Sequence, residues 1–133
     1  MTGTPPASGD VLEPVRQHFR DPANEIDVGP GWRQLVLECH EAVVAEFPEY
    51  ELGAIKQKLG SLAFQASPRP WKPGGNWTHP EYARLHAVID AFAARSEGIC
   101  ERCGADGSLR EGRRILLVLC DQCETLVPGH GRL

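Results

Sequence analysis

Four cysteines in the C-terminal third of the chain carry the clearest chemistry in this sequence. They form two C-x-x-C pairs, Cys100 with Cys103 and Cys120 with Cys123, and sixteen residues separate the pairs. This spacing falls in the range typical of zinc sites, and four thiolates supply the tetrahedral shell that Zn²⁺ favours. Four protein ligands leave no position open for water or substrate, so we expect a structural rather than a catalytic Zn²⁺.

Two other uses of the four cysteines stay open at this point. A pair of disulfides needs an oxidising compartment, but residues 1–9 have neither the basic start nor the apolar core of a signal peptide, so we expect a cytoplasmic protein with reduced thiols. An iron–sulfur cluster would use the same ligands. The fifth cysteine, Cys39, stands at helical spacing from Leu35 and Val43, which indicates a place in the core.

The histidines offer little support for catalysis. The His–carboxylate neighbours are His40 with Glu41, and His79 and His86 near Glu81. No recognisable nucleophile motif and no glycine-rich phosphate loop accompanies them. We therefore expect a protein that is not an enzyme.

A tryptophan-containing loop is the strongest candidate for binding a partner. Residues 67–78 (SPRPWKPGGNWT) are rich in proline and glycine and show no periodicity, so they predict a loop. Aromatic and arginine side chains are enriched at binding hot spots, which makes Arg69, Trp71, Lys72 and Trp77 the candidate partner-binding residues. The alternative is that one or both tryptophan rings cover the core.

The charge of the chain favours a protein partner over nucleic acid. The formal net charge is −4, whereas binding to a phosphate backbone normally requires a basic patch. Arg110, Arg113 and Arg114 are candidate nucleic-acid contacts, although acidic residues share their segment. The sequence holds no apolar stretch of the roughly 20 residues that a membrane span needs, so we expect no membrane association.

Two amphipathic helices and a hairpin are predicted to form the body of the fold. Apolar residues at three- and four-residue steps predict a helix over 31–47 with Trp32 on its buried face, and Pro48 ends it. Strands over 50–58 and 62–65 are joined by a turn at 59–61. A second helix follows Thr78, with Glu81 at the capping-box position, a buried stripe that includes Tyr82, and Gly98 ending it in a left-handed conformation. Asp10 predicts a shorter helix through Phe19.

The segment that carries the cysteines is predicted to form its own small module. Residues 100–104 indicate a zinc knuckle, 113–119 a strand paired with residues near Leu109, and 121–127 a helical turn. With that last helix the module resembles a treble clef, and without it a zinc ribbon.

The predicted fold class is α+β, with helices packed on a small antiparallel hairpin or sheet and a C-terminal four-cysteine zinc ribbon or treble clef. We expect a disordered tail over 1–9, the α+β body over 10–97, the metal module over 98–127 packed on the body, and a tail over 128–133.

Several blocks of the chain form a larger pattern. They are Gly29–Trp32 ahead of a helix with Cys39 and His40, the segment 55–62 (IKQKLGSL), the helix end 94–96, and the two cysteine pairs. Together they resemble a group of small, uncharacterised bacterial and phage proteins with a GW…(V/I)KEKFGxLRFY…S…CExCG…LCxxC pattern, over about residues 29–124. The hairpin departs from that group, because Leu59 replaces Phe and 63–65 (AFQ) replaces RFY. The resemblance implies a shared fold and a metal site, and no activity.

The sequence therefore predicts a non-enzymatic protein with a structural four-cysteine zinc site that acts through macromolecular, chiefly protein–protein, interaction. An immunity protein or antitoxin, or a phage or mobile-element accessory factor, fits the size and acidity. The alternative function is a nucleic-acid-binding zinc-ribbon regulator.

Overall fold

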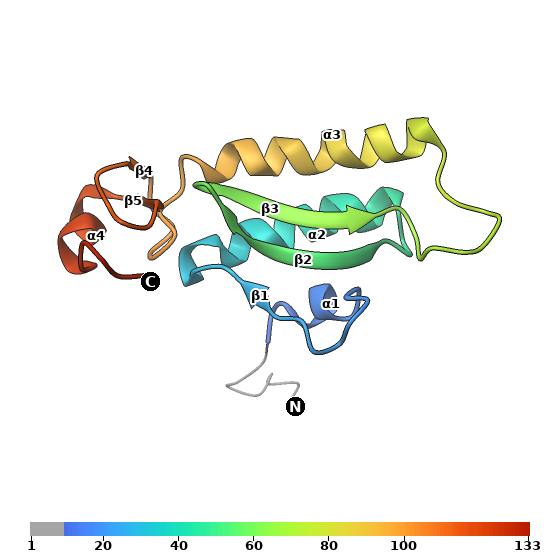
Figure 1. Ribbon diagram of the computed structural model, residues 1–133, viewed down its shortest axis with the longest axis horizontal. Helices are drawn as coiled ribbons and strands as arrows, with labels where there is room; N and C mark the ends of the chain where they lie inside the picture. Colours follow the sequence, from blue (N-terminus) through green and yellow to red (C-terminus); the bar gives the residue numbers. More distant parts are fainter. Residues whose placement is uncertain (1–9) are drawn as a thin grey trace, which may run out of the picture.

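The computed structural model describes residues 10–133, and the tail predicted over 1–9 lies outside them. The chain folds as an α+β structure with two small sheets, which confirms the predicted class (Figure 1). In chain order the elements are α1 (Glu13–Arg16), β1 (Ile26–Asp27), η1 (Pro30–Trp32), α2 (Arg33–Glu46), β2 (Glu51–Lys58), β3 (Ser61–Ser67), α3 (His79–Ser96), β4 (Ser108–Arg110), β5 (Leu117–Leu119) and α4 (Asp121–Leu126).

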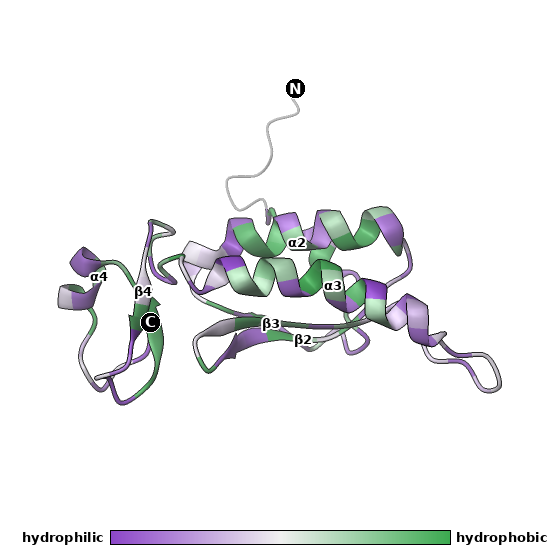
Figure 2. Cartoon of the chain, turned by 90° about the horizontal axis from the view of Figure 1, so that it is seen from above, coloured by the Kyte–Doolittle hydropathy of each residue, from purple (hydrophilic) through white to green (hydrophobic). Residues whose placement is uncertain are grey.

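The larger sheet is built on the predicted hairpin. Its strand order is β1-β2-β3, with β2 antiparallel to β3 and β1 parallel to β2. Leu59 and Gly60 form the two-residue turn, both with positive φ (54° and 84°). Positive φ at both central residues gives the turn the twist that antiparallel strands require. Viewed from above, α2 and α3 lie on the same side of this hairpin (Figure 2).

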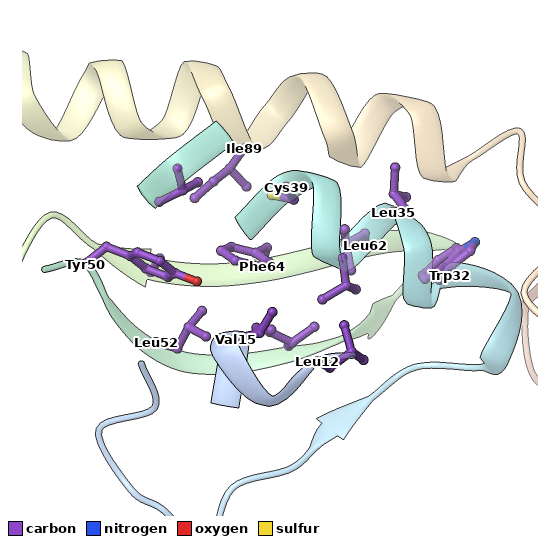
Figure 3. Close-up of a cluster of buried hydrophobic side chains, with 14 of the residues drawn as sticks. Leu12, Val15, Trp32, Leu35, Cys39, Tyr50, Leu52, Leu62, Phe64 and Ile89 are labelled. Carbon is purple, nitrogen blue, oxygen red and sulfur yellow. The ribbon is translucent and has the colours of Figure 1, made fainter. Parts of the chain in front are cut away.

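The helical faces match the apolar periodicity. In α2 the buried residues are Leu35, Val36, Cys39, His40 and Val43, and Trp32 just ahead of the helix is fully buried. Helix α3 begins with the predicted capping box, since the Thr78 hydroxyl accepts the Glu81 N–H and the Glu81 carboxylate accepts the Thr78 N–H. Figure 3 shows Cys39 within this core, close to Ile89 of α3 and Phe64 of β3.

Two details of α3 differ from the prediction. Tyr82 is 37% exposed and lies outside the core, and its ring packs against Trp77 of the loop. Gly98 does not adopt a positive φ. Its N–H instead bonds to the Arg95 carbonyl in a continued helical turn, and the next two residues lead directly into the knuckle.

The N-terminal segment also departs from the prediction. Helix α1 spans only Glu13–Arg16, and its N-cap is Leu12 rather than Asp10, whose carboxylate binds the Leu12 N–H and the Arg16 guanidinium. The chain then extends alongside β2, where Leu52 exchanges backbone hydrogen bonds with His18 and Arg20. Between α1 and η1, Ile26 and Asp27 form the short strand β1 beside β2.

A buried polar cluster connects α2 to the N-terminal segment. The Nδ1 atom of His40 lies 2.6 Å from the Tyr50 hydroxyl, and the His18 ring stacks on Tyr50 at 4.0 Å. His40 is 6% exposed. Burial, together with the nearby His18, lowers the pKa of His40 and favours its neutral form.

Lowering the pH is expected to destabilise the fold through His40. Its folded-state pKa lies below the ordinary value of 6.5, so the unfolded chain binds this proton more readily than the folded chain. The stabilisation is therefore complete above about pH 6.5 and is lost as the pH falls through the lowered pKa. Urea unfolding of the wild type and of His40→Gln, at about pH 7.5 and about pH 5.5, measures the effect. The variant is expected to lose less stability on acidification, and equal losses would contradict the assignment.

Candidate metal centre

The four predicted cysteines converge on one point. The Sγ atoms of Cys100, Cys103, Cys120 and Cys123 all lie within 4.8 Å of one another. The Sγ atoms of Cys103 and Cys120 are 3.7 Å apart. A regular tetrahedron with Zn–S bonds of about 2.3 Å has sulfurs about 3.8 Å apart. The cluster therefore has the size of a shell around a single metal ion, and all five cysteines of the chain are free thiols.

The first cysteine pair lies on a tight turn after α3. The Cys100 carbonyl accepts the Gly104 N–H at 2.9 Å, and Gly104 has a φ of 84°. Only glycine adopts this left-handed conformation without strain, and the turn it permits brings Cys103 back toward Cys100. This is the predicted knuckle.

The second pair begins a helix. Cys120 is the N-cap of α4, and its Sγ accepts the Cys123 N–H at 3.3 Å. The β4–β5 hairpin joins the two pairs, so the module runs from knuckle to hairpin to helix. Of the two predicted arrangements, this order matches the one in which a helix follows the second cysteine pair. Strand β5 is shorter than the predicted 113–119, because residues 111–115 form a turn and bends, where the Arg113 side chain binds the carbonyls of Val127 and Pro128.

The electrostatics of the cluster favour a cation. Burial opposes ionisation of Cys100, but the N–H groups of Cys120, Cys103 and Arg102 outweigh it and lower the pKa of Cys100 to about 6. The Ala105 N–H favours the Cys103 thiolate, yet the neighbouring sulfurs disfavour it and raise the pKa of Cys103. Four thiolates at this separation repel one another unless a positive ion lies between them. The donor set therefore fits a thiophilic metal ion.

Glu101, inside the knuckle, joins the module to the body, and sequence reasoning did not single it out. It is 2% exposed, and its carboxylate accepts hydrogen bonds from the Val118 N–H at 2.7 Å and from Gln57 Nε2 at 3.1 Å. Its main chain pairs with Val118 and accepts the Gly31 N–H. Burial raises the pKa of Glu101, and the two donors oppose that shift. One residue thus contacts β2, η1 and β5.

The start of α2 approaches the knuckle very closely. A Cβ atom on Gly31 would overlap the Cys100 carbonyl and the Gly104 nitrogen, so no other residue fits there without movement. Beside it, the Trp32 indole N–H donates to the Ile99 carbonyl at 2.8 Å. In the sequence, the signal for this contact was that Gly31 and Trp32 lie in one of the blocks that resemble the group of bacterial and phage proteins.

The tryptophan loop lies at the opposite end of the hairpin from the cysteines (Figure 1). Arg69 organises it, donating to the Glu81 carboxylate at 2.6 Å and to the Asn76 carbonyl at 2.9 Å. The Trp77 indole N–H donates to the Arg69 carbonyl at 2.8 Å, and Trp77 is half-buried outside the core. Trp71 is 62% exposed and meets Trp77 edge-on, and Lys72 is exposed beside it. Neither ring belongs to the core.

Two of the three candidate nucleic-acid contacts are engaged within the module. Arg110 is ion-paired with Asp121 and Glu124 and donates to the Leu119 carbonyl. Arg113 is 9% exposed and is ion-paired with Glu124. Arg114 is exposed.

Across residues 10–133, no helix has the length and apolar character needed to cross a membrane. Comparisons with models of protein families, with curated proteins and with solved structures find no match to this chain.

Removing the Glu101 carboxylate is expected to be strongly destabilising. In Glu101→Ala the buried Val118 N–H loses its acceptor and the Gln57 amide keeps only the Leu116 carbonyl, which costs about 2–3 kcal/mol. Guanidinium unfolding measures this difference, and Glu111→Ala, which removes the same charge from an exposed position, is the matched control. A loss below about 0.5 kcal/mol, the usual range for surface substitutions, would show that Glu101 does not join the module to the body.

Proposed function

We propose that the four cysteines bind one structural Zn²⁺ and that the chain acts, without catalysis, by binding another protein through the loop 68–78. The observation that carries the second part is the exposed Trp71, held on a loop that hydrogen bonds keep in place.

The donor set supports zinc as the metal. Soft thiolates select zinc, copper(I) or iron–sulfur centres over magnesium or calcium, and closed tetrahedral shells of four cysteines are typical of structural zinc. The module also has a small core of its own, formed by Cys100, Leu117, Leu119, Cys123 and Val127. Such a core supplies little folding free energy, so bound metal would contribute much of the stability of the module.

The geometry of the loop supports a binding role. An exposed tryptophan on a preorganised loop offers a large apolar area at low entropic cost on binding. The Lys72 N–H donates to the Asn76 side chain at 3.3 Å, and the Gly75 N–H donates to the Lys72 carbonyl. With the Arg69 contacts, these bonds fix the loop on the start of α3. Trp71 then serves as the anchor that enters a pocket on the partner.

The surroundings of the histidines support a non-enzymatic role. His40 lies in the core with its Nδ1 atom on the Tyr50 hydroxyl, out of reach of a substrate in solution. His86 is exposed, and its ring packs at a tilt against Tyr82. The internal pairing of Arg110 and Arg113 supports a protein partner over nucleic acid. An immunity protein, antitoxin, or phage or mobile-element accessory factor is the proposed class, and membership of the resembling bacterial and phage group is part of this proposal.

Replacing one ligand tests the metal site. Cys103→Ser is expected to lower zinc content well below one ion per chain and to speed amide exchange across residues 98–127, because three thiolates bind zinc less tightly than four. Elemental analysis and hydrogen exchange measure the two effects. Cys39→Ala removes a buried thiol outside the cluster and is expected to keep full occupancy. Full occupancy in Cys103→Ser would refute ligation by four cysteines.

Truncating Trp71 tests the binding surface. The tagged chain is used to capture partners from its native cells, with and without nuclease, and the captured protein is then titrated against purified variants. Trp71→Ala is expected to weaken binding by about tenfold or more, with a nearly unchanged Tm, because the ring lies outside the core.

Leu59→Ala is the matched control, since Leu59 is 77% exposed at the far end of the hairpin. A large drop in Tm for Trp71→Ala would instead make the ring a structural element. Recovery that nuclease abolishes, with a steep dependence on salt, would favour the nucleic-acid alternative and direct attention to Arg114.

A further inference from the structure

Strand β3 forms an outer edge of the larger sheet. Its one strand neighbour is β2, with Lys58 paired to Ser61 and Lys56 to Ala63. Backbone groups alternate in direction along an antiparallel strand, so the N–H and C=O groups of Leu62, Phe64 and Ala66 point away from β2. The Leu62 N–H confirms this direction, because it donates to the Ser96 hydroxyl of α3 at 2.8 Å.

Helix α3 satisfies only one end of this edge. The hydroxyl of Ser61 and the N–H of Leu62 bond to the last turn of α3, at Ala93 and Ser96. Further along, no hydrogen bond within residues 10–133 reaches the outward N–H of Phe64 or Ala66. Phe64 and Ala66 are only 3% and 8% exposed as whole residues, so these outward backbone groups have little contact with water.

A groove of about 430 Å³ runs along this part of the edge. It is lined by β3 from Leu62 to Ser67 and by a face of α3, and Arg20 and Gly53 complete the lining; the α3 residues are Tyr82, His86, Ile89, Asp90 and Ala93. Figure 1 shows α3 running along the outer side of β3. Backbone polar groups that face a partly enclosed groove are costly to leave unpaired, and an extended polypeptide offers donors and acceptors at the matching repeat.

The groove is continuous with the tryptophan loop. Trp71 contacts Trp77 at 5.6 Å between ring centroids, Trp77 contacts Tyr82 at 5.8 Å, and Tyr82 contacts His86 at 4.5 Å. The last two of these rings line the groove. The aromatic row therefore leads from the exposed anchor to the unpaired strand edge.

We infer that the partner supplies an extended segment that adds to the sheet as a further strand beside residues 64–67, with its side chains against Tyr82 and His86. This inference rests on the proposed function, since it describes how the same protein partner is held. About four residues cover this length of edge. A single strand fits the occupant better than a second copy of the chain, because α3 runs along this edge and two copies would bring their α3 helices together.

Amide exchange measured by NMR gives the first test. In the free protein the Phe64 and Ala66 amides are expected to exchange faster than those of Ala63 and Gln65, which face β2. Random peptides displayed on phage are then selected against the full chain, and the tightest binder is synthesised. Its binding is expected to slow exchange at Phe64 and Ala66 by about tenfold or more. A selection that yields no binder, or binders that leave these amides unchanged, would overturn the inference.

N-methylation of the selected peptide tests the backbone pairing without altering the protein. Methylation at alternate peptide positions is expected to weaken binding by about tenfold or more, whereas methylation at the intervening positions has little effect. Equal affinity for all methylated peptides would contradict strand addition.

A protein variant separates this inference from the proposed function. Ala66→Pro removes one outward N–H while leaving the ladder to β2, and Gln65→Ala is the control on the same strand. Loss of the captured partner in Ala66→Pro but not in Gln65→Ala is expected. A partner that needs Trp71 but binds Ala66→Pro like the wild type would overturn strand addition and leave the proposed function standing. Sedimentation showing a dimer that Ala66→Pro abolishes would make a second copy the occupant instead.

Discussion

The buried carboxylate of Glu101 is the interaction on which the arrangement of this molecule depends. It stands between two metal-ligand candidates, and its hydrogen bonds reach Gln57 in the body and Val118 in the hairpin of the module. Gln57 also donates to the Leu116 carbonyl at 2.6 Å. A buried carboxylate without hydrogen-bond donors would be strongly unfavourable. The module therefore has to lie where the chain supplies donors for this carboxylate. The knuckle consequently docks at the end of the β2–β3 hairpin.

The two ends of the hairpin therefore have different tasks. At the turn end, the sheet meets the cysteine module, and Val118 of β5 belongs to the main core. At the open end, the start of α3 carries the loop with Trp71, where Tyr82 packs against Trp77 rather than against the sheet. The core holds the two ends apart, so a change in the metal site need not disturb the surface proposed to bind a partner.

Much of this fold follows from local sequence signals. The capping box at Thr78, the apolar faces of α2 and α3, and the glycine of the hairpin turn each reflect interactions within a few residues. The closeness of the two cysteines within each pair was predictable for the same reason, since each pair is closed by its own turn. Such features need no knowledge of the remaining chain.

Most of the features that sequence reasoning missed are non-local. Strand β1 has two residues and pairs with β2, about thirty positions later. It is too short to show an alternation of apolar and polar residues in the sequence. The role of Glu101 depends on Gln57, 44 positions away. Asp10 precedes a segment that could form a longer helix. Residues 18–20 of that segment instead pair with Leu52 of β2. Tyr82 fitted the apolar stripe of α3. Only the position of the start of α3 relative to the sheet shows that this side chain lies outside the core.

The contact between Gly31 and the knuckle has a consequence for the order of folding. The Trp32 indole and the Ile99 carbonyl that it binds are 67 positions apart, and the surface that receives the knuckle includes η1 and β2. That surface does not exist until the body has folded, and contacts between distant positions form late because the intervening chain must first be ordered. The cysteine turns can close by themselves, whereas their docking must wait. The cysteine module and the body are thus expected to join in a final step whose rate is set by the folding of the body.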